Sequence, residues 1–337
     1  MRSSIPMDTA LQRLIDCHST PGDEGEVRDV LEACWRASGW RTERFGEYAV
    51  IARSTAEKSP RPVLLVCAHM DSPGYAVDRL TSVPAPKPGL VRFGVTELGG
   101  PDFTGKTDAV LKTTRGRFPG NLLTVPAAGG EADQVFELTA DDAARAEARH
   151  GDRICFAAAE AGQEGSLVHG PFLDNRLGCW MLTRLACEAL TWRTEYEIVL
   201  GATASEELCG FGARVLAAHV RPDLVIVLDT TYEAEEQGVR LGGGPVLTLS
   251  DTSVLLSPAL RDRVLEIAAR AGVPLQTEVY NFSGTDARAF PQQGLACPVL
   301  PVLIPSRGNH SPVETADLGD LEAWLKAIRA VAENFRG

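Results

Sequence analysis

Residues 196–229 read YEIVLGATASEELCGFGARVLAAHVRPDLVIVLD, and this stretch decides the fold class. It contains two short apolar runs, at 197–204 and 223–229, with the length and composition of buried strands. Between them, residues 207–220 carry apolar side chains at helical spacing. A strand, a helix and a second strand in this order are typical of an α/β domain with a parallel sheet.

The same alternation extends in both directions from this stretch. Further buried-strand runs occur at 62–69 and 298–305, and segments with helical periodicity occur at 7–17, 25–40, 175–190, 258–273 and 317–335. Continuous apolar strands indicate a sheet that is covered on both faces. We therefore expect an α/β fold with a mostly parallel central sheet and helices on both faces.

Residues 72–170 have a different composition from the rest of the chain. They are rich in Pro, Gly, Val and Thr, and their apolar residues fall in short alternating runs such as GLVRFGVTEL at 89–98. One helix is expected, near 139–149. This pattern indicates a β-rich, barrel-like domain at 72–170. It is inserted into a catalytic α/β domain that is made of residues 1–71 and 171–337.

Residues 100–107, GPDFTGKT, match the phosphate-binding loop of nucleotide hydrolases. That loop functions when a buried strand precedes it and a helix begins at the Lys, so that backbone amides face the phosphates. Here the match lies inside the β-rich insert and is followed by DAVLKTTRG, which alternates like a strand. We therefore predict a turn between strands and no nucleotide site.

Charge and composition restrict the class of partner. The net charge of −12 argues against nucleic acid or an anionic membrane, because both are recognised through clustered Lys and Arg. No apolar run approaches the length of a membrane span, and residues 1–19 lack the apolar core of a signal peptide. The eight cysteines form no C-x-x-C pair, which favours free thiols in a reducing compartment. We expect a cytoplasmic protein.

Polar side chains stand where the predicted strands end or where the chain re-enters the α/β domain. Six of them are potential metal ligands: His69, Asp174, Glu206, Glu207, Asp229 and His310. Ligand sites in α/β sheets lie beyond the carboxyl ends of the strands. We therefore expect these six side chains to meet at one edge of the sheet.

Six ligands are more than a single zinc ion uses, since zinc takes four in total. They suit two metal ions about 3.5–4 Å apart, the separation found in dinuclear hydrolases. A mixture of imidazole and carboxylate suits zinc or a neighbouring transition ion such as cobalt or manganese. Asp71, two residues beyond His69, is placed to orient the imidazole.

Taken one at a time, these residues have ordinary structural explanations. A His after a strand is usually a loop residue, and Asp174 before a helix can be an N-cap. The adjacent Glu206 and Glu207 are harder to explain, because neighbouring buried carboxylates repel unless a cation lies beside them. Adjacent strand residues point to opposite faces, so both glutamates can serve one site only from the loop beyond the strand.

An ordered set of motifs carries a family resemblance. The motifs are AHMDSPGY, FLDNRLGC, ATASEELCGFGA, VIVLDTT, LGGGPVLTLSD, SGTDA and HSPVETADLGDLE. The set resembles the dinuclear metallo-aminopeptidases of the tetrahedral-aminopeptidase and glutamyl-aminopeptidase family, some members of which are labelled endoglucanase. The resemblance covers nearly the whole chain and is weakest in the insert. It implies one metal ion on His69 and Asp229, a second on Glu207 and His310, and a bridging Asp174.

The resemblance also implies that Glu206 is the general base of a metal-dependent aminopeptidase acting on peptides, with two ions that are zinc or cobalt. Members of the family build dimers into dodecamers, which together with the insert's strand edges implies a homo-oligomer. Two departures from the family pattern, Gly308 and Ser72-Pro73, are expected near the substrate and bear on specificity.

Three alternatives to the aminopeptidase interpretation stay open at this point. One is a dinuclear amidohydrolase, or deacylase, acting on small N-acyl substrates, which the same metal site could serve. Another is a metal-binding assembly protein without catalysis, which the presence of Glu206 and of every potential ligand disfavours. A nucleotide hydrolase comes last.

Overall fold

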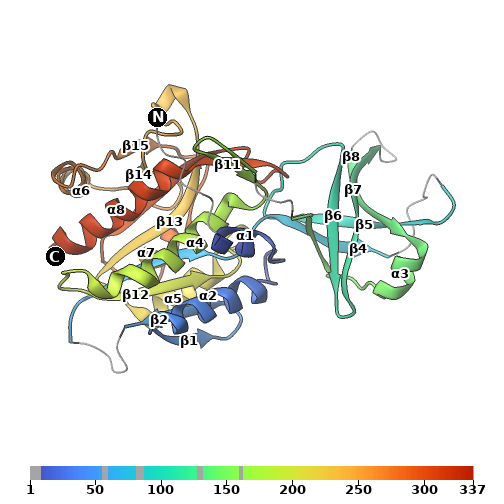
Figure 1. The fold of residues 1–337 in the computed structure, drawn as a ribbon, viewed down its shortest axis with the longest axis horizontal. Helices are drawn as coiled ribbons and strands as arrows, with labels where there is room; N and C mark the ends of the chain where they lie inside the picture. Colours follow the sequence, from blue (N-terminus) through green and yellow to red (C-terminus); the bar gives the residue numbers. More distant parts are fainter. Residues whose placement is uncertain (1–8, 55–59, 81–86, 127–131, 159–161, 337) are drawn as a thin grey trace.

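The computed structural model describes residues 9–54, 60–80, 87–126, 132–158 and 162–336. It has a larger α/β part and a smaller β-barrel that stands to one side of it (Figure 1). The first helix, predicted from residue 7, is observed from Thr9, and residues 7 and 8 lie outside the described part. Within the described ranges, none of the helices has the length and apolar character that crossing a membrane requires.

The α/β part is built on an eleven-stranded sheet with the order β1-β2-β12-β3-β13-β16-β17-β11-β10, to which β14 and β15 are joined through β16. The strands are Arg41–Phe45 (β1), Ala49–Arg53 (β2), Val63–His69 (β3), Gly162–Glu164 (β10), Leu167–Gly170 (β11), Glu197–Thr203 (β12), Leu224–Tyr232 (β13), Val246–Ser250 (β14), Gln276–Val279 (β15), Val299–Arg307 (β16) and Glu314–Asp317 (β17). The central strands β12, β3, β13 and β16 run parallel, and antiparallel strands extend the sheet at both edges. The prediction of a mostly parallel central sheet is confirmed.

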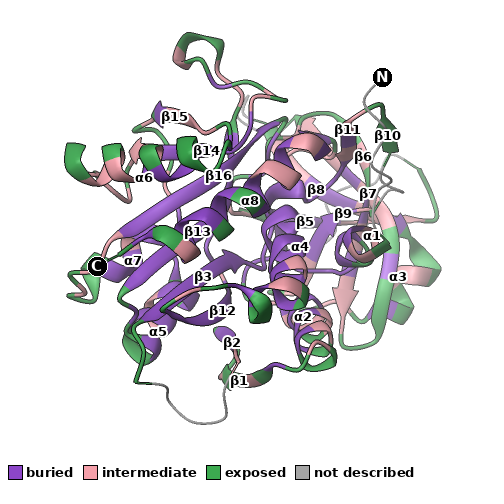
Figure 2. Ribbon diagram, turned by 60° about the vertical axis from the view of Figure 1, so that its left-hand side comes forward, coloured by how far each residue is buried: buried purple, intermediate pink, exposed green. Residues whose placement is uncertain are grey.

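Helices cover both faces of this sheet, as predicted. The helices are Thr9–Ile15 (α1), Gly25–Ala37 (α2), Leu173–Glu188 (α4), Phe211–Val220 (α5), Pro258–Arg270 (α6), Ala289–Gln292 (α7) and Leu318–Asn334 (α8), with 3-10 turns at Ala189–Thr191 (η1), Glu235–Gln237 (η2) and Asp286–Arg288 (η3). Along β3, Leu64 and Val66 belong to an apolar cluster that includes residues of α1, α2, α4 and α8, whereas Val63 and Leu65 belong to a second cluster with residues of α5 and α7. The central strands are therefore buried along their length (Figure 2).

The smaller part is a closed antiparallel barrel with the order β4-β5-β8-β7-β6-β9. Its strands are Gly74–Arg79 (β4), Leu90–Leu98 (β5), Lys106–Thr113 (β6), Gly116–Pro126 (β7), Ala132–Thr139 (β8) and Arg153–Phe156 (β9). Its helix, Ala140–Ala146 (α3), begins where Thr139 accepts a hydrogen bond from the backbone N–H of Asp142. The predicted barrel-like, β-rich domain and its one helix are confirmed.

The barrel strands account for only part of the segment 72–170. Strands β10 and β11 follow the barrel in sequence but belong to the large sheet, where β11 pairs with β17. A pattern of short alternating strands does not reveal which of two sheets a strand joins. Residues 72–170 therefore stay a proposed insert, whose last strands lie against the α/β part.

Residues 100–105 lie in the connection between β5 and β6, as predicted, and Lys106 and Thr107 are the first residues of β6. Lys106 is exposed and is the first residue of β6. Phosphate binding by such a loop depends on the amides of a helix that begins at the Lys. No helix begins there, so the resemblance to a phosphate-binding loop is one of letters alone.

Neither the wild-type protein nor Lys106→Ala should bind ATP, because the connection offers no helix N-terminus to the phosphates. Isothermal titration calorimetry with MgATP should show no binding heat for either protein, and their thermal unfolding midpoints should agree closely. Binding by the wild-type protein that is lost in Lys106→Ala would show that the loop is a nucleotide site after all.

Candidate metal centre

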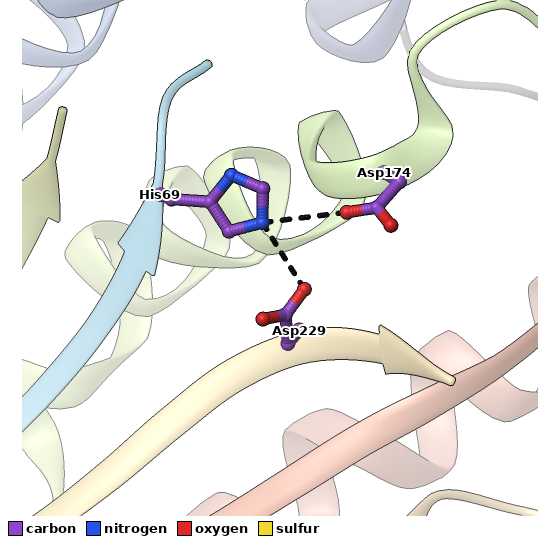
Figure 3. Close-up of side chains that lie close together, drawn as sticks. All are labelled: His69, Asp174 and Asp229. Atoms are coloured by element: carbon purple, nitrogen blue, oxygen red, sulfur yellow. Dashed lines mark hydrogen bonds and ion pairs between the residues drawn. The ribbon is translucent and has the colours of Figure 1, made fainter. Parts of the chain in front are cut away.

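The predicted ligands come together at the carboxyl edge of the central strands. Strands β3 and β13 are parallel neighbours, so His69 at the end of β3 and Asp229 in β13 reach the same edge. Asp174 lies at the start of α4, and His310 lies in the connection between β16 and β17. Figure 3 shows the His69 ring directed at both aspartates.

The first ligand group consists of His69, Asp174 and Asp229, all of which are buried. Nε2 of His69 lies 3.3 Å from Oδ1 of Asp174 and 3.2 Å from Oδ1 of Asp229. On the other side of the ring, Nδ1 lies 3.1 Å from the carbonyl oxygen of Asp71 and 3.6 Å from its Oδ1. These contacts leave Nε2 facing the two carboxylates.

The second ligand group consists of Asp174, Glu207 and His310. Nε2 of His310 lies 3.6 Å from Oδ2 of Asp174 and 3.3 Å from Oε2 of Glu207. Asp174 thus belongs to both groups, with Oδ1 toward His69 and Oδ2 toward His310. A carboxylate shared in this way suits a pair of bridged metal ions.

The two adjacent glutamates lie in the turn beyond β12, which confirms their expected position. The carboxylate of Asp71 accepts the backbone N–H of Glu206 at 3.1 Å and that of Glu207 at 3.2 Å. Asp71 therefore ties the end of β3 to this turn. The two side chains diverge: Glu207 faces His310, whereas Oε1 of Glu206 accepts a hydrogen bond from Nη2 of Arg288 at 2.6 Å.

The electrostatics of the cluster fit a bound cation. Burial raises the pKa of Glu206 to about 8, and burial together with Asp174 raises the pKa of Glu207 well above its usual range. Burial alone would lower the pKa of His69, but the charges of Asp229 and Asp174 raise it well above its ordinary value. Oδ1 of Asp174 and Oε1 of Glu207 are buried and accept no hydrogen bond from the described residues. Such oxygens, beside imidazole nitrogens, suit zinc or cobalt.

The ligands line a cavity of about 380 Å³. Its wall also contains Tyr232, Tyr280, Phe282 and Arg288. The volume lies in the lower part of the range for small-molecule sites, about 300–1,000 Å³. The cavity therefore suits a small molecule or the end of a peptide chain.

A family model described as M42 glutamyl aminopeptidase matches residues 49–326, which include both ligand groups. The chain belongs to the M42 glutamyl aminopeptidase family. It is therefore a metal-dependent peptidase of the aminopeptidase class, and the resemblance stated from the motifs is confirmed.

Several relatives and solved structures align over nearly the whole chain. The chain is 30% identical to FrvX of Escherichia coli (strain K12), over 95% of this chain and 93% of that protein. It is 26% identical to the glutamyl aminopeptidase of Lactococcus lactis subsp. cremoris (strain MG1363), over 94% of each. Its fold is similar to that of the TET1 peptidase of Pyrococcus horikoshii, with a TM-score of 0.81, 23% identity and coverage of 97% and 99%.

Two buried glutamates that the sequence analysis did not single out support the ligands of this M42 peptidase. Glu314 accepts the backbone N–H of Asp174 at 2.7 Å and that of His310 at 3.1 Å, one on each carboxylate oxygen. Glu24 accepts the backbone N–H of Ser205 at 3.0 Å, just before the glutamate turn. Glu314 lies in the last quoted motif, which was a usable signal, whereas no pattern pointed to Glu24.

The two departures from the family pattern have structural explanations. Gly308 has φ 68, and a Cβ there would lie 2.7 Å from the carbonyl oxygen of Val313, so the turn between β16 and β17 excludes a side chain. The hydroxyl of Ser72 is buried and donates to the carbonyl oxygen of Asp174. Among the described residues, neither Gly308 nor Ser72-Pro73 lines the cavity.

The barrel reaches the metal centre through the connection between β5 and β6. The carbonyl oxygen of Gly100 lies 3.1 Å from Nδ1 of His310, and the backbone N–H of Asp102 donates to the His310 carbonyl at 2.9 Å. Gly99 lines the cavity, and a Cβ there would lie 2.7 Å from Cβ of Glu207. The segment that matched a phosphate-binding loop therefore helps to position His310, a candidate metal ligand.

Gly99→Ala should weaken metal binding at the group that contains Glu207, because the new methyl group displaces that side chain. Contacts beyond the ligands typically contribute about 10- to 100-fold to metal affinity, and we expect a loss of this size. The matched control is Gly105→Ala, which also has positive φ but has no atom within 4 Å of the added Cβ. Metal content after dialysis, measured by mass spectrometry, should fall only in Gly99→Ala. Equal metal content in the two variants would contradict the expectation.

Proposed function

We propose that this peptidase removes the N-terminal residue from peptides with a free amine, using two divalent ions, zinc or cobalt. The observation that carries the proposal is the position of Asp174, which faces His69 with one oxygen and His310 with the other. In this proposal His69 and Asp229 complete one ion's ligands, and Glu207 and His310 complete the other's. Asp71 orients the imidazole of His69 and the turn that carries the glutamates.

Two bound ions would supply Lewis acidity, which lowers the pKa of a water and polarises the scissile carbonyl. Glu206 is the proposed proton carrier, because it lines the cavity but belongs to neither ligand group. Arg288 donates a hydrogen bond to its Oε1, so we assign the proton transfer to Oε2. Oε2 accepts a proton from the attacking water, and the same carboxyl then donates a proton to the leaving amine.

Exopeptidase action is supported by the size of the cavity. A volume of about 380 Å³ encloses the end of a peptide rather than a long segment. The preference for a free N-terminus is inferred from the aminopeptidase family to which the chain belongs.

The test is an assay of the purified protein against matched peptides with free and acetylated N-termini, with and without a chelator. We expect cleavage of the free peptides, little cleavage of the acetylated ones, loss of activity with chelator and recovery with zinc or cobalt. Faster turnover of the N-acetylated peptides would overturn the proposal and favour a deacylase. Full activity in chelator would exclude a metal-dependent reaction.

We further propose a homo-oligomer, from dimer to dodecamer, with contacts that include residues from 72–170. The TET1 peptidase of Pyrococcus horikoshii, which shares the fold, is described as able to assemble into a tetrahedron or a large octahedral shell. Multi-angle light scattering at micromolar concentration should show a mass that is a multiple of 36.1 kDa, and a monomer would contradict the proposal. We also propose a cytoplasmic location, because the eight cysteines are free thiols. From the net charge of −12 we propose that neither nucleic acid nor a membrane is a partner.

A further inference from the structure

Arg288 lines the cavity, and in the proposed chemistry it serves only to hold Glu206. Among the described residues that line the cavity, it is the only Lys or Arg. It stands at the end of η3, and its side chain is 33% exposed while that of Glu206 is 7% exposed. A guanidinium at this place brings a positive charge to a wall whose other described side chains are acidic, imidazole, hydroxyl, amide, aromatic or aliphatic.

The guanidinium of Arg288 is held in place. Its Nη2 donates to Oε1 of Glu206 at 2.6 Å, and its Nε packs near Gly210, where a Cβ would lie 3.8 Å away. The side chain of Thr285 caps η3 by accepting the backbone N–H of Ala287 at 3.2 Å. One arm of the guanidinium is thus bonded to Glu206, and the side chain, which is 33% exposed, forms part of the cavity wall.

Because Arg288 lies beside Glu206, the position of Glu206 determines which part of a bound substrate Arg288 can contact. In the proposed function, Glu206 donates a proton to the leaving amine, so the residue after the scissile bond lies beside Glu206. In a dipeptide, the α-carboxylate is separated from that amine by a single carbon atom. A guanidinium bonded to Glu206 therefore lies within reach of this carboxylate. Arg suits this task because its planar fork binds carboxylates with charge-assisted hydrogen bonds.

We propose that Arg288 is a specificity-determining residue that binds a carboxylate on the leaving residue. This inference rests on the proposed function and names its substrate class: peptides whose second residue carries a negative charge. The carboxylate has two possible sources, the α-carboxylate of a dipeptide or the side chain of Asp or Glu at the second position. The small volume of the cavity, about 380 Å³, agrees with short substrates.

The test uses four substrates: Leu-Ala, Leu-Ala amide, Leu-Asp amide and Leu-Asn amide. Leucine is chosen as the N-terminal residue because aromatic side chains line the cavity. The wild-type protein should favour the carboxylate member of at least one pair by about 10- to 100-fold in kcat/KM, the range for hydrogen bonds to a charged group. The pair Leu-Ala and Leu-Ala amide tests recognition of the α-carboxylate, and the pair Leu-Asp amide and Leu-Asn amide tests recognition of an acidic side chain.

Arg288→Gln should remove the preference, and Arg288→Lys should keep part of it. Loss of the contact with Glu206 will lower activity toward all four substrates, so the decisive quantity is the ratio within each pair. The matched control is Arg261→Gln on α6, where the wild-type side chain is exposed and pairs with Asp262, and its ratios should equal those of the wild type. A wild-type ratio near one in both pairs, or an unchanged ratio in Arg288→Gln, would overturn the inference.

A binding measurement separates this inference from the proposed function. The probe is an analogue of Leu-Ala that has a methylene group in place of the scissile carbonyl, so the peptidase cannot hydrolyse it. By titration calorimetry, the wild-type protein should bind its acid form about 10-fold or more tightly than its amide form, and equal affinities would contradict the role of Arg288. If none of the four substrates is cleaved, the proposed function fails. If all are cleaved without preference, only the inference about Arg288 fails.

Discussion

Glu206→Gln should lower turnover by about 10²- to 10⁴-fold, the usual contribution of general acid-base assistance, while both metal ions stay bound. The amide has nearly the same shape as the carboxyl group, and it can neither take a proton from water nor give one to the leaving amine. Glu206 belongs to neither ligand group, so its loss removes no metal ligand. Peptide binding should be largely retained.

Glu207→Gln is the matched comparison, because it makes the same chemical change one residue away. Glu207 lies 3.3 Å from His310 and belongs to the second ligand group, so its loss should lower metal content as well as turnover. Both variants are measured by steady-state kinetics beside metal analysis. If Glu206→Gln loses metal while Glu207→Gln keeps both ions, the two roles are reversed. A fully active Glu206→Gln would contradict the proposed mechanism.

Asp174→Asn should have the second large effect, a loss of metal from both ligand groups at once. The two groups share this carboxylate, so removing its negative charge weakens both. Activity should fall close to background, and excess zinc or cobalt should restore only a small part of it. The measurement is metal content after dialysis, followed by activity in a series of metal concentrations.

Two controls distinguish this effect from a general loss of structure. Asp262→Asn makes the same change at an exposed position on α6 and should leave metal content and activity unchanged. Thermal unfolding of metal-free Asp174→Asn shows whether the fold survives, since Thr230 and Asn309 lie in hydrogen-bonding contact with Asp174 in the wild type. A folded Asp174→Asn that keeps two ions would show that Asp174 is no shared ligand.

The general position of the site could be predicted from the sequence because it follows from strand ends. His69, Glu207, Asp229 and His310 each stand just beyond or at the end of a strand that reads as a buried apolar run. Parallel neighbours in a sheet bring such residues to one edge whatever the details of packing. The ligand groups formed by these residues with Asp174 follow from this rule.

The supporting residues could not be predicted in the same way, because their positions depend on tertiary packing. Glu24 reaches Ser205 across 181 positions of sequence, and Arg288 reaches Glu206 across 82 positions. No local sequence pattern indicates either of these two contacts. Gly100 contacts His310 from the connection between barrel strands β5 and β6, and the residues around it suggested an unrelated function. Such contacts require the structure, and the contact between Arg288 and Glu206 carries the inference about Arg288.

The most direct test of the dinuclear site is a titration of the metal-free protein with zinc or cobalt, in which bound ions and aminopeptidase activity are measured together. We predict that activity requires metal and that binding saturates at two ions per chain, one for each group that shares Asp174. Full activity with a single bound ion, or saturation at one ion or none, would contradict the account.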